Sequence, residues 1–225
     1  ATTLAEKCYS DMFYRCTSLT TSPELSATTL ANSCYEAMFL ECTSLTTAPE
    51  ILPATELADF CYKGMFSGCT SLTNAPELPA TTLTSGCYWT MLNGCTSLTT
   101  VPEILPATTL AQHCYNTMFG SCKSLTTAPE LPATTLAQSC YNSMFYGCTS
   151  LTTAPELPAT ELAEVCYNGM FRKCTNLNYI KCLATDISAR ICTGDWVDGV
   201  SSTGTFVKHP DMNNWPTGRY GIPSG

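Results

Sequence analysis

The most constraining feature of this sequence is a pair of cysteines that returns seven times at nearly constant spacing. The members of a pair are eight positions apart, and successive pairs are offset by 26 or 27 residues. The pairs are Cys8/Cys16, Cys34/Cys42, Cys61/Cys69, Cys87/Cys95, Cys114/Cys122, Cys140/Cys148 and Cys166/Cys174. A fixed period of this size is typical of repeat proteins, in which each unit buries its apolar side only against its neighbours. The chain is therefore expected to be a solenoid of seven stacked units.

The two lengths of the repeat have a simple origin. Three copies end in Pro-Glu-Leu-Pro, whereas two copies read Pro-Glu-Ile-Leu-Pro and contain one residue more, at Ile51 and Ile104.

The first half of each repeat is predicted to be a helix. At 100° per residue, the apolar residues of the first copy share one half of the helical wheel, and the positions between them vary from copy to copy. These apolar residues are Leu4, Ala5, Cys8, Tyr9, Met12, Phe13 and Cys16. The second half, for example around residues 125–128, predicts a very short strand, because Thr favours extended structure and the prolines interrupt it.

The repeat resembles a known family at this point. The motif Met-Phe-x-x-Cys-x-x-Leu-x-x-Ala-Pro, followed by Leu-Pro-Ala-Thr, is similar to the BspA-like (Treponema pallidum-type) leucine-rich repeat over residues 1–192. It differs in an extra Cys-Tyr turn, in Met where that family has Ala, and in a Pro-Glu step within the strand. The expected fold class is an α/β solenoid, a leucine-rich-repeat superhelix with one short strand and one helix per repeat. The resemblance implies a surface-exposed binding module of bacterial or phage origin.

The two ends of the chain differ from the repeats. We expect the solenoid to occupy residues 1–183 and an irregular C-terminal cap to occupy residues 184–225, with a short strand at Gly-Thr-Phe-Val-Lys. The apolar and aromatic residues of the cap are expected to cover the last coil; they are Trp196, Phe206, Val207 and Trp215. The first coil presents a bare apolar face, which we expect to be covered by upstream residues or by another molecule.

The cysteines are expected to be buried thiols. Two cysteines eight positions apart on a helix are about 12 Å apart, too far for a disulfide. Cys182 and Cys192 lie outside the repeat pattern, and they are the best candidates for a disulfide. The chain has no Cys-x-x-Cys pair and only two histidines, so neither a metal site nor a cofactor is expected.

The composition of the chain argues against several classes of function. The net charge of −8 argues against nucleic acid and anionic membrane surfaces as partners, and no stretch is apolar enough to span a membrane. The sequence contains no catalytic constellation, so an enzyme is not expected.

The candidate binding surfaces are the variable exposed positions of the predicted helix and the Thr-rich strand face. Two sets of repeated polar residues are the candidate binding residues. The first is Thr21, Thr47, Asn74, Thr100, Thr127 and Thr153. The second is a column of glutamates after proline, namely Glu50, Glu77, Glu103 and Glu130, with Glu24 and Glu156 at its ends. Such stacked carboxylates must be either solvated or engaged by cations.

The sequence favours a non-catalytic, surface-exposed adhesion module that binds a protein or a glycan through the solenoid surface. The alternative is a structural protein whose copies assemble end to end into a fibre, a sheath or a virion appendage. Either function places the chain outside the cell, on a cell surface or on a virion.

Overall fold

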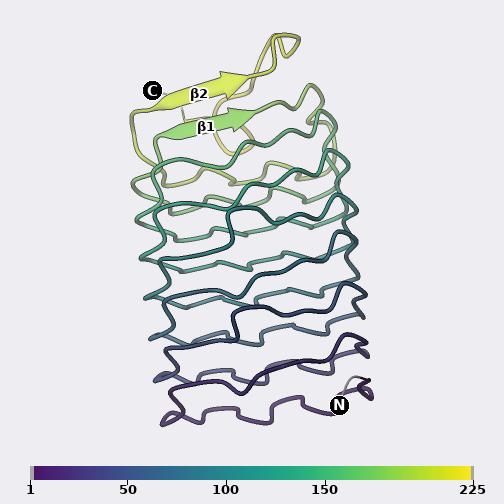
Figure 1. The fold of residues 1–225 in the computed structure, drawn as a ribbon. Coiled ribbons are helices and arrows are strands. Elements are labelled where there is room, and N and C mark those ends of the chain that lie inside the picture. The colour runs from purple at the N-terminus through teal and green to yellow at the C-terminus, as the bar shows by residue number, and fades with distance from the viewer. Residues whose placement is uncertain (1–2, 224–225) are drawn as a thin grey trace.

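The chain winds into a stack of similar coils that runs from the N-terminus to the C-terminus (Figure 1). The structure, a computed structural model, describes residues 3–223. Backbone hydrogen bonds join positions one repeat apart. The amide of Phe13 donates to the carbonyl of Met38 at 2.8 Å, and that of Phe119 donates to the carbonyl of Met144 at 2.9 Å. One repeat is therefore one coil, hydrogen-bonded to the next.

The predicted secondary structure of these coils is wrong. Between residues 3 and 223 there is no α-helix, and the structure contains two short strands, β1 (Tyr179–Cys182) and β2 (Thr205–Lys208), which pair in parallel. The chain is thus not an α/β superhelix with one helix and one strand per repeat. It is a solenoid whose coils consist mostly of turns and single β-bridges.

A chain of overlapping turns replaces each predicted helix. In residues 113–122, alternate amides donate within the coil to the carbonyl three residues back, as Met118 does to Tyr115 at 3.1 Å. The amides between them donate to the next coil, as Thr117 does to Asn142 at 2.8 Å. Every amide of this segment therefore has a partner, which is the condition for burying backbone polar groups.

The turns repeat every four residues. His113, Thr117 and Ser121 have positive φ values of 58°, 53° and 59°, and each is the third residue of a turn, where type II geometry requires positive φ. Glycine, which adopts this conformation without strain, occupies the position of Thr117 in two other coils, as Gly64 and Gly169.

This four-residue period explains why a helix was predicted. Along each segment, two buried residues are followed by two outer ones. On a helical wheel of 100° per residue, each buried pair lies only about 40° from the pair four residues before it. Thirteen residues therefore spread over half of the wheel and look like one broad apolar face. The missed signal is glycine at positions that would be helix interiors, where it is unfavourable by roughly 1 kcal/mol.

Proline explains where a strand forms. In the coil of Thr127, the predicted strand near residues 125–128 is reduced to one bridge, Thr127 to Thr153, followed by Pro129. The last full repeat has no proline at this position, and there β1 forms. Because proline cannot donate to a β-ladder, its absence allows the longer pairing with β2.

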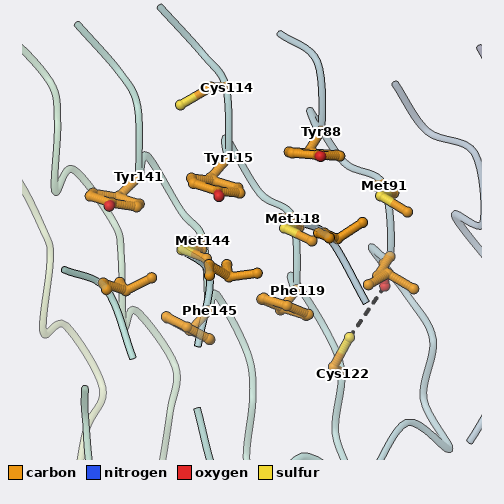
Figure 2. Packing of buried hydrophobic residues seen from close by; sticks show 14 of the residues in the cluster. Tyr88, Met91, Cys114, Tyr115, Met118, Phe119, Cys122, Tyr141, Met144 and Phe145 are labelled. Carbon is orange, nitrogen blue, oxygen red and sulfur yellow. Dashed lines mark hydrogen bonds between the residues drawn. The ribbon is translucent and has the colours of Figure 1, made fainter. Parts of the chain in front are cut away.

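Identical side chains stack in columns to form the core, as Figure 2 shows for Tyr88, Tyr115 and Tyr141. The rings of Tyr88 and Tyr115 are 5.6 Å apart between centroids, and those of Phe119 and Phe145 are 5.6 Å apart, all nearly parallel. Burial raises the pKa of these tyrosines well above the usual value. The core is one continuous cluster over the length of the stack.

The cysteines are free thiols, as expected. All sixteen belong to the described residues; fourteen are buried, and Cys8 and Cys16 of the first coil are exposed. Cys182 and Cys192, the disulfide candidates, are free as well. From the second coil on, the second cysteine of each pair donates its S–H to a carbonyl of the preceding coil, as Cys122 does to Leu92 at 3.2 Å (Figure 2). This contact satisfies a backbone oxygen inside the core.

The C-terminal segment covers the last coil. Trp196 is fully buried, stands against Phe171 at 6.5 Å between ring centroids, and donates its indole N–H to the Gly221 carbonyl at 2.6 Å. Phe206 of β2 and Trp215 complete an aromatic cluster with Trp196. The predicted short strand in this segment is confirmed as β2. The four-residue turns also continue here through Gly199, whose φ is 74°.

Candidate functional site

The candidate binding residues lie on one side of the stack, which we call the Thr/Glu face. All members of both predicted columns are exposed. The Thr column is Thr21, Thr47, Asn74, Thr100, Thr127 and Thr153, and the Glu column is Glu24, Glu50, Glu77, Glu103, Glu130 and Glu156. The bridges Thr21–Thr47, Asn74–Thr100 and Thr127–Thr153 align neighbouring coils, so the side chains recur at the coil spacing, roughly 4.8 Å for paired strands.

Two threonines beside the Thr column help to hold coils together. Thr46 and Thr99 donate to the carbonyls of Thr20 and Thr73 in the preceding coil, at 3.0 and 3.4 Å. Within residues 3–223, the exposed side chains of Thr100, Thr127 and Thr153 have no such partner. These three members of the Thr column therefore offer their hydroxyls to solvent.

The Glu column is held in place by its backbone. The amides of Glu77 and Glu130 donate to the carbonyls of Glu50 and Glu103 at 2.8 Å. These two contacts occur at the two longer repeats, where the inserted Ile51 and Ile104 are exposed. The carboxylates themselves extend into solvent, one per coil.

One cation ends the column. Lys181 of β1 takes the next position after Glu156, and its ammonium contacts the Glu156 carboxylate at 2.8 Å. The hydrogen bond that Lys181 donates to the Glu156 carboxylate raises the pKa of Lys181. Among the residues that the structure describes, Glu24, Glu50, Glu77, Glu103 and Glu130 have no ion-pair partner.

A shallow groove runs between the two columns. Its first part has a volume of about 510 Å³ and reaches from Glu24 to Val101, and its second has about 440 Å³ and shares Thr100 and Val101 with the first. A separate hollow lies on the other side of the Glu column, between Glu130 and Pro158. The structure thus brings the predicted Thr and Glu residues to one continuous surface.

The floor of this groove was not predicted. It consists of the half-buried small residue that stands before each proline, namely Ala48, Ala75, Val101 and Ala128. The signal was present in the sequence, because the Thr-Thr-Ala-Pro step recurs in three copies. Small side chains there leave room between the Thr and Glu columns.

Neither a membrane segment nor a metal cluster was found in the described part of the chain. No helix of residues 3–223 is long and apolar enough to cross a bilayer. No three side chains of His, Cys, Asp or Glu within that range converge in a way that could hold a metal ion.

Comparison with known proteins gives a structural likeness. No protein-family model matches the chain, and no curated protein matches it. A leucine-rich repeat protein from Bacteroides ovatus is similar in structure, with a TM-score of 0.31 and 15% identity, over 90% of this chain and 67% of that one. A TM-score of this size does not establish a common fold. The solenoid is defined by the hydrogen bonds between its own coils.

Proposed function

We propose that this chain is a non-catalytic interaction module that binds a protein or a glycan through the Thr/Glu face. We propose further that it acts outside the cell, on a cell surface or on a virion, as the resemblance to BspA-like repeats implies. The observation that carries the proposal is that the polar residues of this face are exposed and nevertheless repeated from coil to coil.

Burial accounts for repetition in the core but not on this face. Positions such as Tyr115 and Met118 recur because each must pack against the same residue of the next coil. Exposed positions vary freely on the turn side, by which we mean the segments of overlapping turns such as residues 113–122; Glu6, Asn32 and Gln112, for example, share one column. Simple duplication of a coil would have preserved both sides equally. The repetition of exposed Thr and Glu therefore supports a role in recognition.

The periodic surface also suits a non-catalytic role. The Thr/Glu face offers the same hydroxyl and carboxylate in each coil, whereas a catalytic site needs different groups that converge on one reacting atom. A regular array instead makes many similar contacts with an extended partner, and their small energies add.

Screening on glycan and peptide arrays tests this proposal. We expect the wild-type chain to bind a subset of the array, and the variant Thr100→Ala/Thr127→Ala/Thr153→Ala to lose that binding. The matched control is Thr82→Ala/Thr109→Ala/Thr135→Ala, three exposed threonines of a different column, which should retain it. Equal binding by both variants, or equal loss in both, would contradict a role for the Thr/Glu face.

A further inference from the structure

We infer that the groove of the Thr/Glu face takes an extended, basic polypeptide segment, with Lys or Arg side chains along the Glu column. The inference rests on the proposed function and names the class of partner. It is carried by the shape of the groove, by the charge along one wall, and by the way the chain itself completes that wall.

The groove is long enough to hold an extended polypeptide segment. Its two hollows adjoin through Thr100 and Val101, so that they follow the axis of the stack over several coils. From Glu24 to Glu130 there are four coil steps, or roughly 19 Å at the spacing of paired strands. An extended segment of about six residues spans this distance at ~3.3 Å per residue.

The charge of the groove is one-sided. Five carboxylates of the Glu column have no ion-pair partner among residues 3–223, and the wall opposite them is uncharged. Acidic ligands would be repelled, and a neutral glycan would gain nothing from the carboxylates beyond hydrogen bonds. A line of cationic groups is the complement, because each ammonium or guanidinium can pair with a carboxylate of the column.

Lys181 shows how a cation sits on this wall. It occupies the next position of the Glu column, and its ammonium lies 2.8 Å from Glu156 while its side chain is 35% exposed. The same contact is open at Glu130 and at the four carboxylates before it, where the chain supplies no cation within the described residues.

The rest of the groove suits the remainder of a basic peptide. The floor of Ala48, Ala75 and Val101 can receive the apolar stems of Lys and Arg, which pack on apolar surface while their charged ends reach solvent. Asn74 and the hydroxyls of the Thr column can both donate to and accept from a peptide backbone. The groove therefore offers a partner for each part of such a segment.

Fluorescence anisotropy with labelled octapeptides tests this inference. The probes are an alternating Lys-Ala peptide and an alternating Glu-Ala peptide, each titrated with the chain at 50, 150 and 300 mM NaCl. We expect binding of the Lys-Ala peptide that weakens as salt increases, because exposed ion pairs are screened, and no binding of the Glu-Ala peptide.

Matched variants separate the groove from general attraction by an acidic protein. The variant Glu77→Gln/Glu103→Gln/Glu130→Gln removes three carboxylates of the groove and should weaken binding of the Lys-Ala peptide about tenfold. The control Glu6→Gln/Glu56→Gln/Glu161→Gln removes three exposed carboxylates elsewhere and changes the net charge equally. It should change the affinity by less than about twofold, since long-range attraction is weak in salt.

The outcomes distinguish this inference from the proposed function. Equal weakening in both triple variants would overturn the groove as the site, and so would equal affinity for the two peptides. Binding of Ca²⁺ by the wild-type chain in 150 mM NaCl, together with no binding of the Lys-Ala peptide, would identify the Glu column as a calcium ridge and overturn the peptide. Array ligands that need the Thr column but contain no basic segment would overturn this inference alone and leave the proposed function standing.

Discussion

The turn side and the Thr/Glu face of each coil solve the same stacking problem in different ways. On the turn side, the amides of residues 113–122 all have partners, half of them within the coil and half in the next coil. On the Thr/Glu face, single bridges such as Thr127–Thr153 alternate with prolines, and a groove remains. Where the backbone makes many hydrogen bonds between coils, the exposed side chains vary from coil to coil. On the Thr/Glu face, where such bonds are few, the same exposed side chains recur.

The exposed side chains that vary on the turn side have little effect on the stability of the stack. Arg15 and Glu41 form an ion pair between coils at 2.6 Å, and Arg172 and Asp198 form another at 3.0 Å, all four side chains being at least 44% exposed. Pairs this exposed contribute little to stability, about 0–1 kcal/mol. The turn side therefore does not depend on any particular pair.

The largest expected effect is a loss of stability when a core column is interrupted. Phe119→Ala removes a fully buried ring from the stack of Phe119 and Phe145 and should lower the free energy of unfolding by about 3–5 kcal/mol. Urea denaturation followed by circular dichroism measures this loss. A decrease below about 1 kcal/mol would mean that the column does not carry the stability of the coil.

Alkaline pH should destabilise the stack through the same columns. Burial raises the pKa of Cys69 to about 12 from 9.0 and that of Tyr35 to about 12 from 10.0. The folded state therefore keeps these protons while the unfolded chain releases them, so stability is fully present below pH 9 and falls as pH rises from about 9 to 12. Urea midpoints at pH 7, 9 and 10.5, with a reductant present, should decrease in that order.

A control for the alkaline prediction is the variant Tyr35→Phe, which lacks one of the titrating groups. Its midpoint should fall less steeply above pH 10 than that of the wild type. A midpoint that is independent of pH up to 10.5 would contradict the burial of these thiols and phenols.

A smaller effect distinguishes the turn side from the helix that was predicted there. Ala37 has a φ of 53°, so Ala37→Gly should relieve backbone strain and raise the free energy of unfolding by up to about 1 kcal/mol. In a helix interior the same change would lower it by about 1 kcal/mol. Thermal or urea unfolding gives the sign.

The reverse change, Gly64→Ala, tests the same column in the next coil. Its new Cβ would meet only the hydroxyl of Thr90 at 3.6 Å, so the expected loss of about 1 kcal/mol comes from the backbone alone. Stabilisation by Gly64→Ala would restore the helix as the better description of this segment.

The smallest expected effect on stability lies on the Thr/Glu face. Thr127→Ala removes an exposed hydroxyl that has no partner within the described residues, and it should change the free energy of unfolding by less than about 0.5 kcal/mol. If the Thr/Glu face is a binding surface, the same change should weaken ligand binding on an array. A loss of stability near that of Phe119→Ala would instead give the repeated threonines a structural role.

The sequence predicts the period, the buried columns and the exposed columns of this molecule, but not its backbone. Cysteine spacing locates each coil, and the invariance of Tyr115, Met118 and Phe119 identifies the core, because packing against identical neighbours requires identical residues. The helix prediction was wrong because periods of 3.6 and 4 residues are nearly indistinguishable over thirteen residues. Only the glycines, such as Gly64, could have separated them.

For the candidate site, the sequence identifies the two walls and misses the groove between them. The Thr and Glu columns are visible as repeated polar residues, but their relative position depends on how the Pro-interrupted segment bends. That bend follows from coil-to-coil contacts such as Glu77 to Glu50, which lie 27 positions apart in the chain. Local propensity carries no information about such contacts, so the floor at Val101 became visible only in the structure.

The matching of every coil to the next has a consequence for how such a gene can grow. The same ring contact joins Tyr88 to Tyr115 and Tyr115 to Tyr141. A coil inserted between two others would therefore make the usual core contacts on both sides. An in-frame duplication of 26 codons would thus lengthen the protein by one coil without requiring a new packing solution. Selection could adjust the reach of the molecule in whole steps, while point mutations on the turn side alter its exterior independently.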